Sequence, residues 1–386
     1  MKKTLIAAAI GAVIAAPAIA QADVTLYGKF EGSLDYLNTA SNTTVNGVYY
    51  GVNDGQSGSI SGVNLNSSRW GIKGSEDLGD GLRAIFQVES TINAEGNPEL
   101  GNRNTFFGLA GGWGAVIAGR HDTPMKELGR SVDLFGDQIG DSRDLISGDK
   151  NIPGVVSSDP TLGDYSSING THGFDLRTAQ TVAYASPKIA GFDFVGAYVM
   201  NGGIKNASAI SVLGKYDMGP LMVGLAYESH GKGMYSGATN DETGVRLAGS
   251  YKLGALKFVG LYEQLSHLGG LENVTYANGQ TDKANMSVYG LGVAYTMGSN
   301  VLKTQVYESN PEGSNNNSTM WDIGAEHHFS KKVMAFIDYA TISNQSLAGA
   351  APWFGGKEYA SYNKAIYTVA PGKDPSAVST GLMISF

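Results

Sequence analysis

Apolar and polar residues alternate along the chain from residue 23 onward, and the segment DVTLYGKFEGSLDYL shows this most clearly. Its two faces are Val24, Leu26, Gly28, Phe30, Gly32, Leu34 and Tyr36 against Thr25, Tyr27, Lys29, Glu31, Ser33 and Asp35. A period of two over more than a dozen residues predicts one β-strand with an apolar and a polar face. Strands of globular proteins usually have about five or six residues, whereas a tilted membrane-spanning strand needs about nine to eleven. The length therefore favours a strand that crosses a membrane.

Later segments repeat this separation of faces. Residues 221–228, 256–263 and 321–329 place aliphatic and aromatic side chains on one face and charged or histidine side chains on the other. The charged or histidine side chains are Glu228, Lys257, Glu263, Asp322, Glu326 and His328. A charge on the lipid-facing side of a barrel costs about 2–4 kcal/mol at the bilayer midplane, so this separation is what a membrane barrel requires.

Two kinds of connection alternate between these segments. Short turns lie near residues 77–81, 111–114, 187–191, 217–220, 252–254, 297–300 and 330–332. Long polar connections lie near 38–65, 90–102, 121–175, 201–207, 230–242, 267–284, 310–318 and 344–374. They separate sixteen strands, with the short turns at one end, the long loops at the other and both termini at the short-turn end.

The predicted fold class is therefore all-β: a 16-stranded antiparallel transmembrane β-barrel over residues 23–386, closed by pairing of the first and last strands. A soluble sandwich or propeller also has alternating strands. It would not explain the strand length, the asymmetry between turns and loops, or so much apolar aromatic surface in one layer.

Residues 1–22 have a different character. Lys2 and Lys3 precede an apolar run over residues 5–20, and Ala20-Gln21-Ala22 stands directly before Asp23. We interpret this segment as a secretory signal peptide, although the length of its run overlaps that of a short transmembrane helix. No run of 18 apolar residues follows, so a closed barrel is the membrane-spanning structure left. Export then predicts location in the cell outer membrane.

Composition and motifs exclude several functions. Removal of the two signal lysines changes the formal net charge from -8 to -10, which disfavours a nucleic-acid partner. The chain has no cysteine, hence no disulfide scaffold or thiolate site. None of its six histidines lies in an H-E-x-x-H motif, and His327 and His328 point to opposite faces of one strand. No nucleophile-elbow motif occurs either. We expect no enzyme activity, no cofactor and no metal.

Several blocks resemble those of Gram-negative general diffusion porins, with the pattern of neisserial and other proteobacterial porins. They are DVTLYGKFEGSLDY, SSRWGIKGSEDLGDGLRAIFQVE, FFGLAGGWGAVIAGRHD, VDLFGDQIGDSRD, VAYASPKIAGFDF and the terminal Phe386. The resemblance implies a homotrimer among outer-membrane lipid and lipopolysaccharide, with the third long loop folded into the lumen to narrow the pore. It also implies that the barrel-assembly machinery reads Phe386. The alternative is that Phe386 belongs to the aromatic girdle at the membrane interface and has no recognition role.

Basic residues are expected at the narrowest level of the pore. Strand parity places Lys29, Arg69 and Arg83 on inward faces. The resemblance implies that Lys29, Arg69, Arg120 and Arg177 form a basic ladder at the constriction. Arginine stays protonated at any relevant pH. Each of these residues could instead be a solvated lumen residue or pair locally with a carboxylate.

Acidic residues of the third loop are expected to oppose this wall. Asp133, Asp137 and Asp141 recur every four residues in VDLFGDQIGD, so a helical turn would present all three on one side. Asp141 could instead pair with Arg143 or fix the loop to the wall.

These observations predict a passive, water-filled channel for small hydrophilic solutes and ions. The sign of its selectivity stays open, since the basic wall favours anions while the loop acids and the net charge favour cations. A barrel lipid hydrolase is one alternative. The other is a barrel that serves mainly as an adhesin or phage receptor through its long loops.

Overall fold

The structure, a computed structural model, describes residues 23–45, 48–52, 58–92, 100–148, 173–235, 237–276, 278–352 and 367–386. Its barrel strands are β1 (Asp23–Asn38), β4 (Ser59–Leu65), β5 (Arg69–Gly79), β6 (Leu82–Thr91), β7 (Thr105–Gly111), β8 (Gly114–Asp122), β9 (Arg177–Ala185), β10 (Phe192–Val199), β11 (Ala209–Met218), β12 (Leu221–His230), β13 (Glu242–Leu253), β14 (Leu256–Ser266), β17 (Met286–Met297), β18 (Asn300–Pro311), β19 (Ser318–His328), β20 (Val333–Asn344) and β22 (Ser376–Ser385). The predicted signal peptide lies outside the described residues.

Short elements occupy the loops. They are the strands β2 (Thr43–Val45), β3 (Val48–Val52), β15 (Asn273–Thr275), β16 (Thr281–Lys283) and β21 (Tyr367–Thr368), the helices α2 (Pro124–Val132) and α3 (Arg143–Ile146), and the 3₁₀ turns η2 (Lys232–Met234) and η3 (Leu268–Gly270). No helix in the described ranges combines the length and hydrophobicity that crossing a membrane demands.

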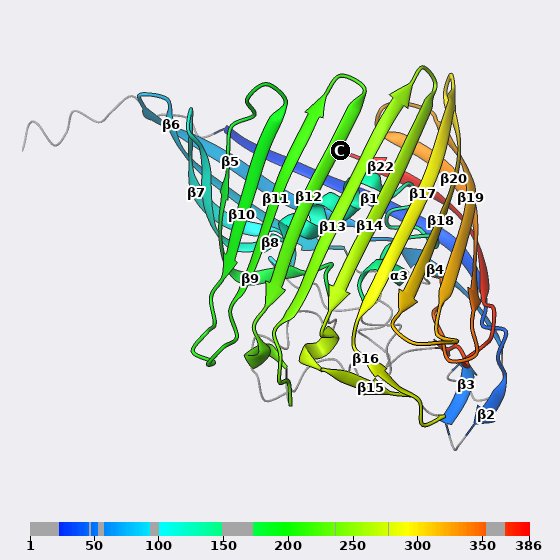
Figure 1. Cartoon of the computed structure of the whole chain (residues 1–386). Coiled ribbons are helices and arrows are strands. Elements are labelled where there is room, and N and C mark those ends of the chain that lie inside the picture. Colours follow the sequence, from blue (N-terminus) through cyan, green and yellow to red (C-terminus); the bar gives the residue numbers. More distant parts are fainter. Residues whose placement is uncertain are drawn as a thin grey trace, which may run out of the picture.

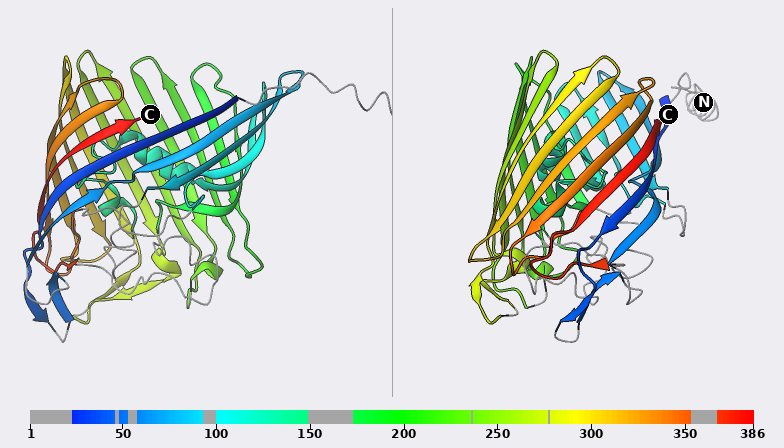
Figure 2. Two further views of the ribbon diagram at one scale, coloured as in Figure 1. Left: turned by 180° about the vertical axis from the view of Figure 1, so that it is seen from behind. Right: turned by 90° about the vertical axis from the view of Figure 1, so that its right-hand side faces the viewer.

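The barrel strands form one closed antiparallel sheet (Figure 1). β4 and β5 pair with successive parts of β1 and act as one interrupted strand, so the described part of the chain contains sixteen barrel strands. β1 also pairs with β22, with Lys29 opposite Ser385 and Asn38 opposite Ser376. Figure 2 shows this seam, where the blue and red strands run side by side. The predicted 16-stranded barrel and its closure are confirmed.

The two faces of each strand follow the predicted alternation. In β1, Leu26, Phe30 and Leu34 are exposed on the outer face, while Glu31 and Asp35 are buried on the inner face. In β12, β14 and β19 the charged side chains likewise point inward and the large aromatic ones outward. The outer face is thus a continuous apolar surface suited to lipid, and the polar side chains point into the barrel.

The third long connection begins with α2. Pro124 occupies the first turn of this helix, and the Thr123 side chain accepts a hydrogen bond from Lys126 N, so the local sequence favours a helix start here. Met125 and Leu128 are buried in a cluster that contains inward side chains of β11, β12, β13 and β14. α2 therefore packs against the inside of the wall, as Figures 1 and 2 show.

Two glycines of the inner wall allow the loop to approach closely. A side chain at Gly292 of β17 would meet Leu134, and one at Gly324 of β19 would meet the Phe135 ring. Glycine weakens a strand interior but leaves room for another segment to pack directly on the backbone. These positions explain part of the high glycine content.

Candidate functional site

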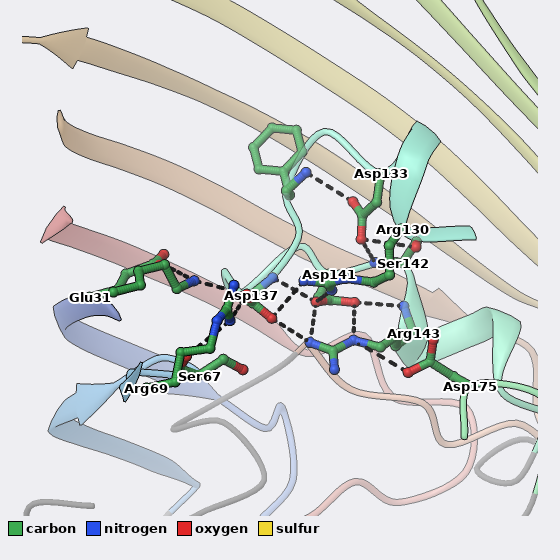
Figure 3. A network of polar contacts seen from close by, with 12 residues as sticks. Glu31, Ser67, Arg69, Arg130, Asp133, Asp137, Asp141, Ser142, Arg143 and Asp175 are labelled. Carbon is green, nitrogen blue, oxygen red and sulfur yellow. Dashed lines mark hydrogen bonds and ion pairs between the residues drawn. The ribbon is translucent and has the colours of Figure 1, made fainter. Parts of the chain in front are cut away.

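Asp137 lies at the centre of a network of charged side chains from the wall and the third loop (Figure 3). Lys29 Nζ lies 2.9 Å from its carboxylate and Arg130 Nη2 lies 2.7 Å from it. Arg143 Nη2 and Arg69 Nη1 approach it at 3.0 and 3.7 Å. β1, β5, α2 and α3 thus each direct one cation at a single acid.

Asp141 is held by the same loop arginines. Arg130 Nη1 lies 2.8 Å from its carboxylate, and Arg143 reaches it through Nη2 at 2.5 Å and Nε at 2.8 Å. Asp141 also accepts a hydrogen bond from Asp137 N at 2.7 Å. The alternative in which Asp141 pairs with Arg143 is therefore the observed arrangement.

The helical turn predicted for the three acids is wrong. α2 ends at Val132, Asp133 caps it in an extended conformation, and Asp137 has a positive φ of 69°. Gly136 and Gly140 disfavour a helix through this stretch. The backbone instead makes successive tight turns, so the acids do not share one helical face.

Asp133 faces the wall and the loop backbone. Its carboxylate accepts hydrogen bonds from Phe135 N at 2.9 Å, from Ser142 N at 3.1 Å and Oγ at 3.0 Å, and from Gln305 Nε2 at 3.3 Å. Burial, together with the nearby charge of Asp141, raises the pKa of Asp133 to about 6. Asp133 is therefore ionised near neutral pH, like its two neighbours, but takes up a proton at a higher pH than they do.

The other two acids remain ionised. Burial alone would raise the pKa of Asp137, but the positive charges of Arg130, Lys29 and Arg143 outweigh it and hold that pKa well below its ordinary range. The pKa of Asp141 is likewise lowered, since Arg143 and Arg130 outweigh burial. Arg130, Arg143 and Lys29 thus balance the negative charges of Asp137 and Asp141.

Two cations of this network, Arg69 and Arg130, reach solvent more than the acids do. The side chains of Arg69 and Arg130 are 29% and 27% exposed, whereas those of Asp137 and Asp141 are 8% and 0% exposed. The surface that the network presents to the lumen is consequently positive.

A neighbouring cluster contains Arg177. Its Nε lies 3.1 Å from Asp122 Oδ1 and donates to Asn104 Oδ1 at 3.0 Å. Lys126 Nζ lies 3.2 Å from the same carboxylate of Asp122. Arg177 thus pairs with an acid of the wall rather than with an acid of the third loop.

The two remaining predicted cations lie elsewhere on the sheet. Arg120 is partly buried in β8, opposite Thr105 and beside a register irregularity between Gly119 and His121. Arg83 is exposed in β6, opposite Asp77 of β5, close to the short-turn end. The structure therefore brings Lys29 and Arg69, among the predicted basic residues, into contact with the loop acids.

The sequence does not predict the part that Arg130 takes in the site, and it offers Arg143 only as an alternative partner of Asp141. The segment ELGRSVDLFGDQIGDSRD places an arginine on each side of the three aspartates, and this flanking was the available signal. In the described part of the chain, no group of three or more histidine, aspartate or glutamate side chains is arranged to hold a metal ion.

Phe386 follows the closing strand, and its backbone N and O exchange hydrogen bonds of 3.1 Å with Gly28. Its ring is half exposed and lies where a side chain at Gly28 would be. Val378, Leu382 and Ile384 share its outward face.

The raised pKa of Asp133 predicts a pH effect on ion preference. As pH falls from 7.5 to 5, Asp133 takes up a proton and the interior loses one negative charge, so the anion-to-cation permeability ratio should rise by up to about threefold. Reversal potentials measured across this range would show the change. Asp133→Asn should remove most of it, and an unchanged pH profile in that variant would contradict the assignment.

Comparisons with known proteins agree with this architecture. A family model described as Gram-negative porin matches residues 5–347. An outer membrane porin protein of Bordetella pertussis is 28% identical over 388 residues, which cover 88% of this chain and 94% of that protein. Major outer membrane protein P.IB of Neisseria lactamica is 30% identical over 363 residues, covering 90% and 96%.

A solved structure supports the fold. The anion-selective porin from Comamonas acidovorans superposes with a TM-score of 0.70 at 23% identity, covering 95% of this chain and all of that chain.

Proposed function

Since this chain belongs to the Gram-negative porins and is a non-enzymatic channel for passive diffusion across the outer membrane, we propose that its pore prefers anions. The observation that carries the proposal is the unequal exposure of the charged network, in which Arg69 and Arg130 reach the lumen and Asp137 and Asp141 do not. Charge at the narrowest level of a pore decides which ions enter. The anion selectivity named for the Comamonas porin is consistent with this proposal.

The third loop is proposed to form the constriction. Lys303 Nζ donates to Leu134 O and Gln305 Nε2 donates to Gly140 O, both at 2.8 Å, so the segment between Leu134 and Gly140 rests on the inside of β18. From there it reaches Lys29 on β1 through Asp137. A segment tied in this way reduces the cross-section open to solutes.

The proposed basic wall extends beyond this contact. Lys29 and Arg69 form its centre, Arg120 and Arg177 continue it along β8 and β9, and Arg83 lies toward the short-turn end. Asp133, Asp137 and Asp141 are the opposing loop acids, of which the last two are largely neutralised by ion pairs.

Size-matched solutes test the proposal. Proteoliposomes that contain the purified channel should admit the anion galacturonate faster than neutral galactose, and galactose faster than the cation galactosamine. Swelling rates in isotonic solutions give this order directly. The reverse order would contradict the anion preference, and an absence of swelling would contradict the channel itself.

A homotrimer is proposed to form through the short strands on one side of the barrel. β6, β7 and β8 expose Phe86, Phe107, Leu109 and Val116 on their outer face. A Vibrio cholerae outer-membrane protein of similar fold, with a TM-score of 0.58, is described in a trimer form. Unheated electrophoresis should show a band near three times the chain mass, and a monomer band alone would contradict the proposal.

Lipopolysaccharide is proposed to contact a polar groove at the long-loop rim. The groove lies at the ends of β11 and β12 and is lined by Ser208, Ser229, Lys232, Asn240 and Asp241. Ile210, next to it, is exposed on the lipid-facing side. Lys232→Glu should reduce the lipopolysaccharide that copurifies with the channel, whereas Lys205→Glu, in the preceding loop, should not. Equal amounts in both variants would contradict this location.

Phe386 is proposed to be read by the barrel-assembly machinery. Phe386→Ala should lower the yield of folded, heat-modifiable barrel in cells several-fold while leaving refolding of the purified chain in detergent nearly unchanged. Phe329→Ala removes an exposed aromatic at a short turn and is the matched control. An equal loss of yield in both variants would favour the alternative of a girdle aromatic.

A further inference from the structure

Arg246 of β13 joins both ends of the third loop to the wall. Its side chain points inward and is fully buried. Nη1 donates to Met125 O in α2 at 2.8 Å, and Nη2 donates to Phe174 O, on the returning side of the loop, at 3.3 Å. One guanidinium therefore binds two backbone segments that are far apart in the sequence.

Glu263 fixes the orientation of this guanidinium. It lies opposite Arg246 on β14 and is also fully buried. Arg246 Nη2 lies 2.8 Å from Glu263 Oε1, and Nε lies 3.2 Å from Oε2. A bidentate pair of this kind restricts a guanidinium to one plane and leaves its remaining donors directed at fixed points.

Packing around the loop root supports the same role. The Phe174 ring stacks on His230 with centroids 4.8 Å apart. The two ring nitrogens of His230 lie 2.9 and 2.7 Å from carboxylate oxygens of Glu228 and Glu242. Both ring nitrogens therefore face carboxylates, and these contacts fix the orientation of the ring. A rigid charged cluster thus supports the segment that Arg246 binds.

The barrel itself does not depend on this side chain. β13 and β14 are joined by a continuous backbone register from Thr243 opposite Ser266 to Leu253 opposite Leu256. Within α2, a side chain at Gly129 would meet Arg246 Nη1, so the helix is in direct contact with the guanidinium. Loss of Arg246 should therefore release the loop and leave the strands paired.

We propose that Arg246 is a positioning residue for permeation: by clamping both ends of the third loop to the β13–β14 wall, it sets the distance between the loop arginines and Lys29 and Arg69. It controls pore size and ion preference without facing the pathway. This inference rests on the proposed constriction by the third loop.

Single-channel recording of Arg246→Met in the full chain tests the proposal. We expect conductance to rise roughly 1.5-fold with added open-channel noise, and the anion-to-cation permeability ratio to fall toward one. Arg246→Lys should give intermediate values, because one ammonium cannot donate to Met125 O, Phe174 O and the Glu263 carboxylate in the same geometry. Lys188→Met, which removes an exposed cation at a short turn away from the third loop, should behave as the unmodified channel.

Wild-type conductance, noise and reversal potential in a folded Arg246→Met channel would overturn the proposal. If that variant does not fold, the double variant Arg246→Met with Glu263→Met is tested instead. It removes both buried charges and occupies their space with apolar side chains of similar size. A changed conductance in the double variant supports the role of Arg246, and an unchanged one overturns it. Failure of the unmodified chain to conduct would instead contradict the proposed function.

Discussion

Arg69→Glu is expected to shift the pore from anion preference toward cation preference. Arg69 is among the more exposed cations of the network, and its contacts with Asp137 and Glu89 are long, at 3.7 and 4.0 Å. A change of two charges about 6 Å from a passing ion alters its energy by about 1.4 kcal/mol in a water-like medium, which is about tenfold in the permeability of each ion, in opposite directions for anions and cations. Reversal potentials in a salt gradient would measure this change.

The control for this prediction is Lys188→Glu. Lys188 is exposed at a short turn, where it pairs with Asp217, and it lies away from the network. Lys188→Glu changes the net charge by the same amount as Arg69→Glu. We expect a large shift for Arg69→Glu and little for Lys188→Glu. Equal shifts would mean that overall charge, rather than the constriction, decides the preference.

Phe135→Ala is expected to detach the central part of the third loop from the wall. The Phe135 ring is fully buried, packs over Gly324 and lies under the Lys303 ammonium, whose Nζ is 4.3 Å from the ring centroid. Truncation of a buried phenylalanine costs about 3–5 kcal/mol, which is enough to loosen a segment held mainly by such contacts. Larger neutral sugars should then enter proteoliposomes, and single-channel conductance should rise.

Phe192→Ala is the matched control, since Phe192 is exposed on the outer face of β10. It should leave the size limit unchanged. A size limit that stayed the same in Phe135→Ala as well would show that the segment around Asp137 does not narrow the pore.

The barrel could be predicted from the sequence because its rules are local. Lipid on one side and water on the other impose a period of two on every strand, so the placement of Lys29 inward and Leu34 outward follows from their neighbours. Tight turns such as Asp80-Gly81 also carry their own signal, since both residues have positive φ values.

The interior of the pore could be predicted only in part, because its contacts are not local. Strand parity placed Lys29 and Arg69 inside, but the path of the loop depends on wall positions such as Gln305 and Gly324, far along the chain. The spacing of the three aspartates suggested a helix, whereas the glycines between them and the arginines around them produce a turn.

The charge balance of the site shows the same limit. Counting acids in the third loop suggested a negative wall, yet Arg130 and Arg143 neutralise Asp137 and Asp141 in the folded loop. Arg246 is distant from the loop in sequence, and no local pattern around it marks a contact with the loop. Its two bonds to the loop arise only when the barrel closes around it.

Planar-bilayer recording of the purified, unmodified channel in a potassium chloride gradient tests the channel and its anion preference together. We expect large conductance steps that close in three equal levels and a reversal potential with the sign of chloride preference. A reversal potential of the opposite sign would contradict the anion preference, and no conductance from a folded, heat-modifiable barrel would contradict the channel.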